Sequence, residues 1–122
     1  MTTIEISRDD WQPFFDQFSR EHQGESVNVE VLDDAVGRQA VAQQLPLLGV
    51  TADPKNSEGC MIEILAGDHQ GQTVNHDIRH PAHVRIAQGD DGSDLAVEIT
   101  SEDSPTTILT FGDTEWPPQY GA

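Results

Sequence analysis

Beyond Gly24, apolar side chains recur at every second position in a series of short segments, and this pattern constrains the fold more than any other feature. A two-residue period puts successive side chains on opposite faces of a strand, so each segment predicts a β-strand with one buried face. Turn-forming Asp, Gly, Asn and Pro separate the segments at intervals typical of consecutive antiparallel strands. The predicted strands span residues 27–32, 39–50, 60–65, 72–78, 83–88, 94–100 and 106–111. Pro46 and Gly49 interrupt residues 39–50, which are either a strand pair or one bent strand.

One helix is predicted ahead of these strands. Four aromatic side chains follow the i, i+3, i+4, i+7 spacing of one helix face, and such a stripe indicates core packing. They are Trp11, Phe14, Phe15 and Phe18. Ser7 is expected to cap the helix, with Asp10 in a capping-box-like position, and Gly24 is expected to end it.

These elements predict a single α+β domain over residues 1–111. One N-terminal helix packs on a curved, mostly antiparallel meander of six or seven strands, either open or barrel-like. Residues 112–122 are expected to form an extended tail, because Pro117 and Pro118 exclude a helix. Trp116 and Tyr120 are expected to dock the tail on the body. The PPQY sequence in this tail is a weak match to polyproline ligands of WW modules.

The charge balance excludes several partners. The chain has 22 acidic residues against six basic ones, and a formal net charge of −16. Phosphates repel such a chain, so no direct nucleic acid binding is expected. Three explanations of the acidity remain open: adaptation to high salt, an acidic surface that meets a basic partner, and mimicry of a nucleic acid backbone. Mimicry needs regularly spaced carboxylates, whereas the paired acidic residues here fall at expected turns and caps.

The remaining composition indicates a cytoplasmic protein. Cys60 is the one cysteine, so no internal disulfide forms, and its strand-like neighbours predict a small buried hydrophobe. No segment approaches the roughly 18 apolar residues of a membrane span, and no membrane contact is expected. Common catalytic and phosphate-binding motifs are absent: the sequence contains no GxSxG, no HExxH and no glycine-rich loop followed by lysine. Residues 89–94, GDDGSD, are too short for a calcium loop and predict a hairpin turn.

Residues 75–85, NHDIRHPAHVR, concentrate His76, His80 and His83 with two arginines. On a helix, this spacing would place the three imidazoles on one face, as a zinc site requires. Pro81 and the strand-like composition of residues 73–78 instead favour sheet.

An antiparallel hairpin accommodates this stretch with His80-Pro81-Ala82 as its loop. Matching the apolar faces pairs Ile78 with Val84 and places Asp77 opposite Arg85 on the solvent face. His76 and His83 then lie on opposite faces, so three histidines cannot converge without a bulge.

Three interpretations of this stretch remain open. The first is an ordinary hairpin with partly exposed histidines. The second is an interaction patch of Arg79, His80, His83 and Arg85 that contacts an acidic group. The third is a transition-metal site that uses His76, His80 and His83. The hairpin register favours the first, so the sequence assigns no cofactor, metal ligand or catalytic residue.

The chain resembles a small bacterial family catalogued only as a domain of unknown function. The resemblance rests on ISRDDWQPFFDQFSREHQG at the start, LPLLGVTAD in the middle and VEITSEDSPTTILTF near the end, and covers roughly residues 4 to 111. It implies a small bacterial domain and carries no catalytic residues with it.

Acidity without catalytic motifs favours a non-enzymatic interaction or accessory protein. Its partner is expected to be another protein, or a second copy joined through an edge strand. One alternative is a metal- or small-molecule-binding domain that uses the region from His76 to Arg85. The other is a nucleic acid mimic.

Overall fold

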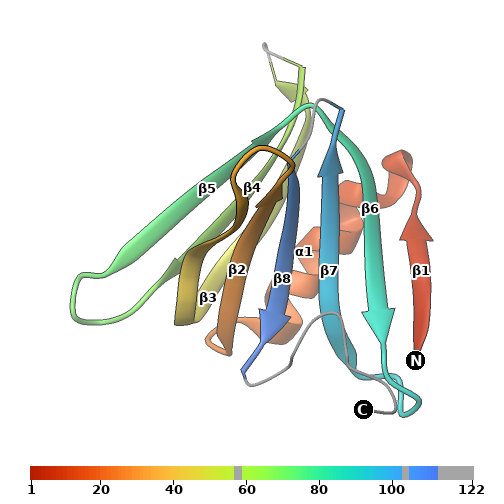
Figure 1. Cartoon of the computed structure of the whole chain (residues 1–122). Coiled ribbons are helices and arrows are strands. Elements are labelled where there is room, and N and C mark those ends of the chain that lie inside the picture. Colours follow the sequence, from red (N-terminus) through yellow and green to blue (C-terminus); the bar gives the residue numbers. More distant parts are fainter. Residues whose placement is uncertain (57–58, 103–104, 113–122) are drawn as a thin grey trace, which may run out of the picture.

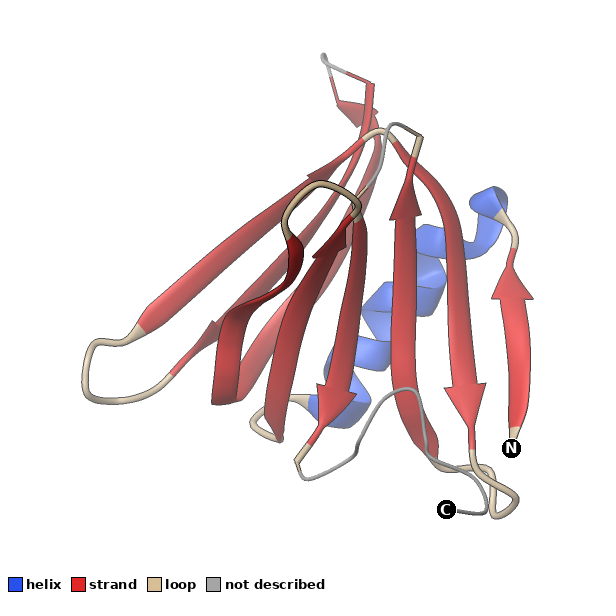
Figure 2. Ribbon diagram, in the orientation of Figure 1, coloured by secondary structure: helices blue, strands red, loops and turns tan. Residues whose placement is uncertain are grey.

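The computed structural model of the chain describes residues 1–56, 59–102 and 105–112, which form one antiparallel sheet and one α-helix (Figure 2). The elements follow in the order β1 (Thr2–Ile6), a 3₁₀ turn η1 (Arg8–Asp10), α1 (Trp11–His22), β2 (Ser26–Asp33), β3 (Gly37–Asn56), β4 (Gly59–Gly67), β5 (Thr73–Arg79), β6 (Pro81–Gln88), β7 (Asp94–Ser101) and β8 (Thr106–Phe111). The predicted α+β class is confirmed. Within the described ranges, no helix is both long enough and apolar enough to cross a membrane.

The eight strands lie in the order β1-β6-β7-β8-β2-β3-β4-β5, and every neighbouring pair is antiparallel. A meander is therefore correct for the runs β2–β5 and β6–β8. The sheet does not close into a barrel, because β1 and β5 form its two edges (Figure 1). The predicted six or seven strands become eight because residues 2–6 form β1. This segment of five residues is too short for its alternation to stand out in the sequence.

β3 is one continuous, bent strand, which decides between the two alternatives that the sequence left open. Its first half pairs with β2 as far as Pro46, and its second half pairs with β4 from Leu47 onward. The register with β2 shifts around Val29, and Gln44 has a φ of 53° there. Asn28 Oδ1 accepts the Gln44 backbone N–H at 2.9 Å. A bulge held in this way bends a strand and increases its twist.

The helix packs into the concave side of this curved sheet (Figure 1). Trp11, Phe15 and Phe18 are no more than 2% exposed and meet apolar side chains from β2 to β8, so the predicted aromatic stripe is core. Gly24 has a φ of 86° just after the helix, a conformation that favours glycine. The predicted cap at Ser7 is wrong in detail, since its Oγ donates to Asp10 Oδ2 at 2.8 Å and not to a backbone group.

α1 also supplies hydrogen-bond partners to the part of β3 that has no neighbouring strand on one side. β2 leaves the second half of β3 unpaired on one side, and Ser19 fills this gap. Its Oγ accepts the Val50 N–H at 2.8 Å and donates to the Val50 carbonyl at 2.9 Å. One hydroxyl thus satisfies both backbone groups of a residue that is 1% exposed.

The predicted tail at residues 112–122, including Trp116 and Tyr120, lies outside the described residues except for Gly112.

Candidate functional site

The stretch at residues 75–85 does not form the predicted hairpin. β5 ends at Arg79, His80 alone turns the corner with a φ of 54°, and β6 starts at Pro81. Ile78 pairs with Ile62 of β4, whereas Val84 pairs with β1 and β7. The hairpin is wrong because each strand finds other partners: β5 turns back on β4, and β6 receives β1. The corner is held by backbone bonds, from His80 N–H to Cys60 O at 3.2 Å and from Glu102 N–H to His80 O at 2.9 Å.

The four residues of the predicted interaction patch fall at two places. His83 and Arg85 project from β6 away from the core, where they lie beside Glu5 and Glu98. The His83 Nδ1 lies 3.0 Å from Glu5 Oε2, and the Arg85 guanidinium lies 3.4 Å from Glu5 Oε1 and 3.3 Å from Glu98 Oε1. Hydrogen bonding to His83, together with the charges of His83 and Arg85, lowers the pKa of Glu5. The predicted pairing of Asp77 with Arg85 is wrong, since Asp77 lies opposite Glu63.

The other two patch residues, Arg79 and His80, line a hollow of about 280 Å³ at the end of β5. His76 lies in the same hollow, half-buried, with Nε2 at 3.2 Å from Thr107 Oγ1 of β8. Burial lowers the pKa of His76, so its imidazole is neutral near pH 7. A neutral imidazole and a hydroxyl offer hydrogen bonds to a small polar molecule, and this is the chemistry that the hollow supports.

The structure does not bring His76, His80 and His83 together as metal ligands. In the described part of the chain, the one group of three donors within 4.8 Å of one another is Glu21, His22 and Asp94. His22 Nε2 lies 2.7 Å from Asp94 Oδ2, and its Nδ1 lies 2.6 Å from Glu25 Oε2. Sequence reasoning missed this cluster because Asp94 is 72 residues away from His22 along the chain.

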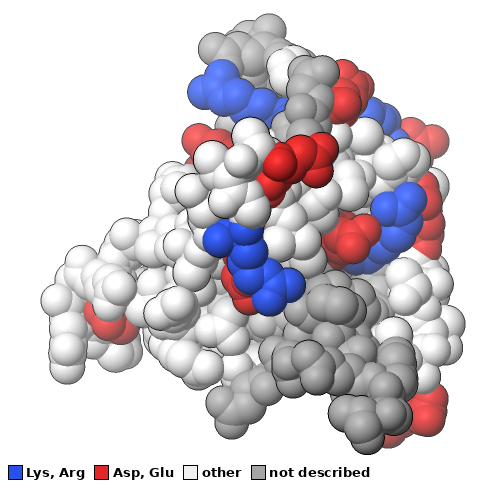
Figure 3. Space-filling model, in the orientation of Figure 1, with Lys and Arg blue, Asp and Glu red and all other residues white. Residues whose placement is uncertain are grey.

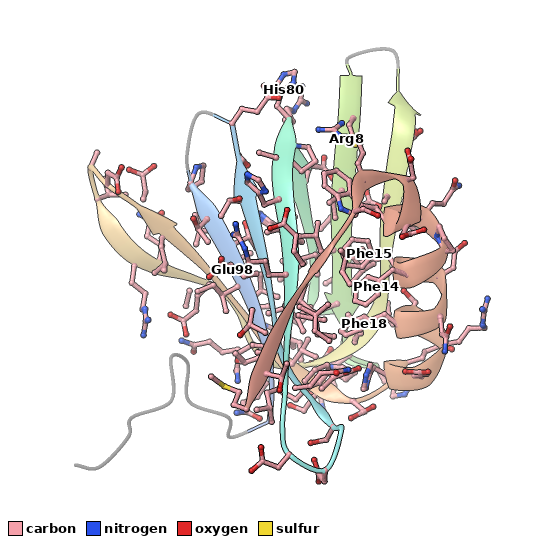
Figure 4. The ribbon with its side chains drawn as sticks, turned by 90° about the vertical axis from the view of Figure 1, so that its right-hand side faces the viewer. Arg8, Phe14, Phe15, Phe18, His80 and Glu98 are labelled. Atoms are coloured by element: carbon pink, nitrogen blue, oxygen red, sulfur yellow. The ribbon has the colours of Figure 1, made fainter. Side chains whose placement is uncertain are left out.

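A groove between β1 and α1 also escaped the sequence analysis. It is about 490 Å³ and is lined by Ile4, Glu5, Ile6, Ser7, Asp10, Pro13, Phe14 and Gln17. A second hollow of about 240 Å³ continues it along the helix, since Phe14 and Gln17 line both. Figure 4 shows Phe14, Phe15 and Phe18 pointing from α1 toward the strands, with β1 beside β6. The alternation of Ile4 and Ile6 was the available signal for a strand here.

The η1 turn at Arg8–Asp10 and the start of α1 fix one wall of this groove. Arg8 donates from its guanidinium to the Pro81 carbonyl at 3.1 Å, and lies over the Trp11 ring at 4.8 Å from its centroid. Trp11 Nε1 in turn donates to the Ile6 carbonyl at 2.9 Å. These contacts tie β1, η1 and the start of β6 together, so the groove is preformed.

Elsewhere on the surface, basic side chains sit beside acidic ones. Figure 3 shows Lys and Arg side chains against Asp and Glu on one face. Arg38 pairs with Glu30 at 2.9 Å, in addition to the pairs that Arg85 makes. Arg38 and Arg85 are thus matched by neighbouring carboxylates, and the chain retains its large excess of negative charge.

A family profile described as "Family of unknown function (DUF5335)" matches residues 2–119. The chain belongs to the DUF5335 family. This confirms the resemblance seen in the sequence, and the matched span contains every element of the described fold. An "Uncharacterized protein" of Aquifex aeolicus (strain VF5) is similar to this DUF5335 chain, with 29% identity over 109 residues that cover 89% of the chain and 91% of the relative. No solved structure matches the chain.

Proposed function

We propose that this DUF5335 protein is a non-enzymatic interaction protein of the cytoplasm that binds an extended segment of another protein along β1. The observation that carries the proposal is the free edge of β1, which pairs only with β6 among the described strands. Its Ile4 is 43% exposed beside the groove along α1. An added strand gains main-chain hydrogen bonds from such an edge, and alternate side chains enter the groove for specificity.

β1 is short, at five residues, but it has neither proline nor a register shift to protect its edge. Proteins block exposed edges with charged side chains, proline or bulges. Glu5 is the one charged side chain of β1, and its carboxylate is already engaged by His83 and Arg85. At the opposite edge, β5 presents exposed Asp77 and Arg79. The two edges therefore differ, and β1 is the one open to a partner strand.

The charge around the groove favours a basic segment. Asp10 lines the groove beside β1, and Glu21 and Asp94 line its continuation, whereas no Lys or Arg lines either hollow among the described residues. The net charge of −16 attracts a cationic partner over a longer range and disfavours pairing with a second, equally acidic copy. The apolar floor formed by Ile4 and Phe14 adds an anchor point for an aliphatic side chain.

A photo-crosslinking residue at position 4 tests this proposal in the native cells. The matched control is the same residue at position 36, because Val36 is also an exposed hydrophobe, at 63%, but lies in the turn between β2 and β3. We expect a crosslink from position 4 alone, to a peptide that carries Lys or Arg beside aliphatic residues. Ile4→Lys should abolish the complex, and Val36→Lys should retain it.

Two outcomes would contradict the proposal. Equal crosslinking from both positions, or a complex that survives Ile4→Lys, would exclude strand addition at β1. Crosslinks exclusively to a second copy would replace the basic partner with self-association. Ile4→Lys should change the free energy of unfolding by no more than about 0.5 kcal/mol, as is usual for a surface position.

A second candidate function is the binding of a small polar molecule in the hollow at the end of β5. The half-buried, neutral His76 and its contact with Thr107 favour this alternative. Small polar compounds can be screened by the NMR shifts of the backbone amides of residues 76–80 and of Thr107, which line the hollow, and His76→Gln should lose the response. This screen distinguishes the alternative from strand addition, which leaves the hollow unchanged.

A further inference from the structure

The imidazole of His22 is enclosed by a carboxylate at each ring nitrogen and by two neighbouring aromatic rings. Glu25 Oε2 lies 2.6 Å from Nδ1, and Asp94 Oδ2 lies 2.7 Å from Nε2. The rings of Phe18 and Phe111 lie at 4.7 and 4.6 Å, centroid to centroid. The side chain is 15% exposed. One residue at the end of α1 therefore contacts β7 through Asp94 and β8 through Phe111.

This arrangement requires a proton on each ring nitrogen. A neutral imidazole has one N–H, so it can satisfy only one of two facing carboxylates, and the other would meet a lone pair. Burial alone would lower the pKa of His22, but the hydrogen bonds and charges of Asp94 and Glu25 outweigh it and raise the pKa above its ordinary value. The imidazolium also favours the C-terminal end of α1, where the helix dipole is negative.

The groups that face this imidazole come from every element around it. A carboxylate oxygen of Glu21 in α1 lies within 4.8 Å of a ring nitrogen of His22 and a carboxylate oxygen of Asp94. Gln88 of β6 donates to Asp94 Oδ1 at 2.9 Å and so holds that carboxylate in place. Glu21, Glu25 and Asp94 thus surround the ring with acidic groups. The positive charge at the centre of these three carboxylates is His22 itself.

We propose that His22 is a proton-dependent latch that holds the C-terminal end of α1 against β7 and β8 and closes the hollow that continues the groove along the helix. Phe18, Glu21 and Asp94 line that hollow of about 240 Å³, so residues of the latch also line the groove. A role of the latch in partner binding rests on the proposed function. The latch itself depends only on the contacts that His22 makes within the protein.

The sign of the pH dependence follows from the raised pKa. Below the ordinary histidine pKa of about 6.5, both the latched and the open states are protonated, and the latch contributes fully. Between that value and the raised pKa, opening releases one proton. The equilibrium constant for opening of the latch therefore rises up to tenfold per pH unit, because the open state has one proton fewer than the latched state. Above the raised pKa, the stabilisation is lost.

The test is hydrogen exchange followed by NMR on the isolated protein from about pH 5 to 9, a range that brackets ordinary histidine titration. Protection factors of the amides of residues 19–23 should fall as the pH rises, in step with the titration of the His22 ring. Asp94→Asn should move that titration to lower pH and weaken protection at low pH. His22→Phe should keep the ring contacts and remove the pH step. His69→Gln, at an exposed histidine in the β4–β5 turn, is the matched control and should behave as wild type.

Flat protection across this range in the wild type, or a His22 titration that Asp94→Asn leaves unchanged, would overturn the latch. If His22→Phe fails to fold, Asp94→Asn still decides, because it removes one charge and leaves the imidazole in place. No partner is present in these measurements. Failure of the latch therefore leaves strand addition at β1 untouched, and failure of the crosslinking leaves the latch untouched.

Discussion

Replacing Ser19 with alanine removes the hydroxyl of α1 that hydrogen-bonds the backbone of β3 where β3 has no neighbouring strand. The Ser19 Oγ accepts the Val50 N–H at 2.8 Å and donates to the Val50 carbonyl at 2.9 Å. Val50 is 1% exposed, so water cannot readily take over either bond. The substitution therefore leaves two buried backbone groups without partners, on the helix that forms one wall of the groove.

The magnitude follows from these two bonds. An unsatisfied buried donor or acceptor costs about 1–3 kcal/mol, so the pair costs roughly 2–6 kcal/mol. Alanine returns about 0.5 kcal/mol through its higher helix propensity. We expect a net loss of about 1.5–5.5 kcal/mol in the free energy of unfolding. An unfolding entropy of about 2.1 cal/mol/K per residue over 122 residues converts this loss to a fall of about 6–21 °C in Tm.

Urea unfolding and calorimetry measure this loss, with Gln17→Ala as the matched control. Gln17 is exposed on the same helix, and its side chain donates only to Glu21 Oε1, at 2.9 Å. The control should therefore stay within about 0.5 kcal/mol of wild type. If Ser19→Ala is no less stable than Gln17→Ala, the view that α1 satisfies the free edge of β3 is wrong.

Three further predictions concern charge and metal. If the acidity is an adaptation to high salt, Tm should rise steeply from low to molar salt as repulsion among the 22 acidic residues is screened, and a flat profile would count against it. A nucleic acid mimic should compete with DNA for a basic DNA-binding protein, and the absence of competition at low salt, where such binding is strongest, removes that alternative. Zinc titration by calorimetry should show no sub-micromolar site that both His76→Ala and His83→Ala abolish, because the two residues lie on strands that do not pair. Loss of such a site in both variants would show that the side chains converge.

Features that depend on near neighbours in the chain were predictable. Three of the four aromatic residues of the α1 stripe, Trp11, Phe15 and Phe18, are buried as their spacing predicts, whereas Phe14 is partly exposed at the groove. Gly24 takes the left-handed conformation expected after a helix. In β5 and β6, the alternation assigned the correct face to each residue: Ile78 is buried, and His83 is exposed. A side chain's face is set by the two-residue period of its own strand, so no distant contact is needed to predict it.

The pairing of those strands was not predictable in the same way. A hairpin at His80 and the observed separation of β5 from β6 bury the same faces, so the pattern is compatible with both. β1 offers Ile4 and Ile6 opposite Ile86 and Val84 and occupies the edge of β6 that β5 would need for the hairpin. β5 pairs with β4 instead, and the predicted patch is divided into two parts.

The sequence by itself determined that the chain is acidic, has one aromatic helix and builds an antiparallel sheet, because composition and periodicity are local properties. Only the tertiary structure decided which strands form the edges of the sheet and which histidine meets two carboxylates. Glu25 lies three residues from His22, but Asp94 and Phe111 reach it only through the order of β7 and β8 in the sheet. A pKa depends on the solvent and charges around the folded group, and these are set by contacts that no sequence window contains.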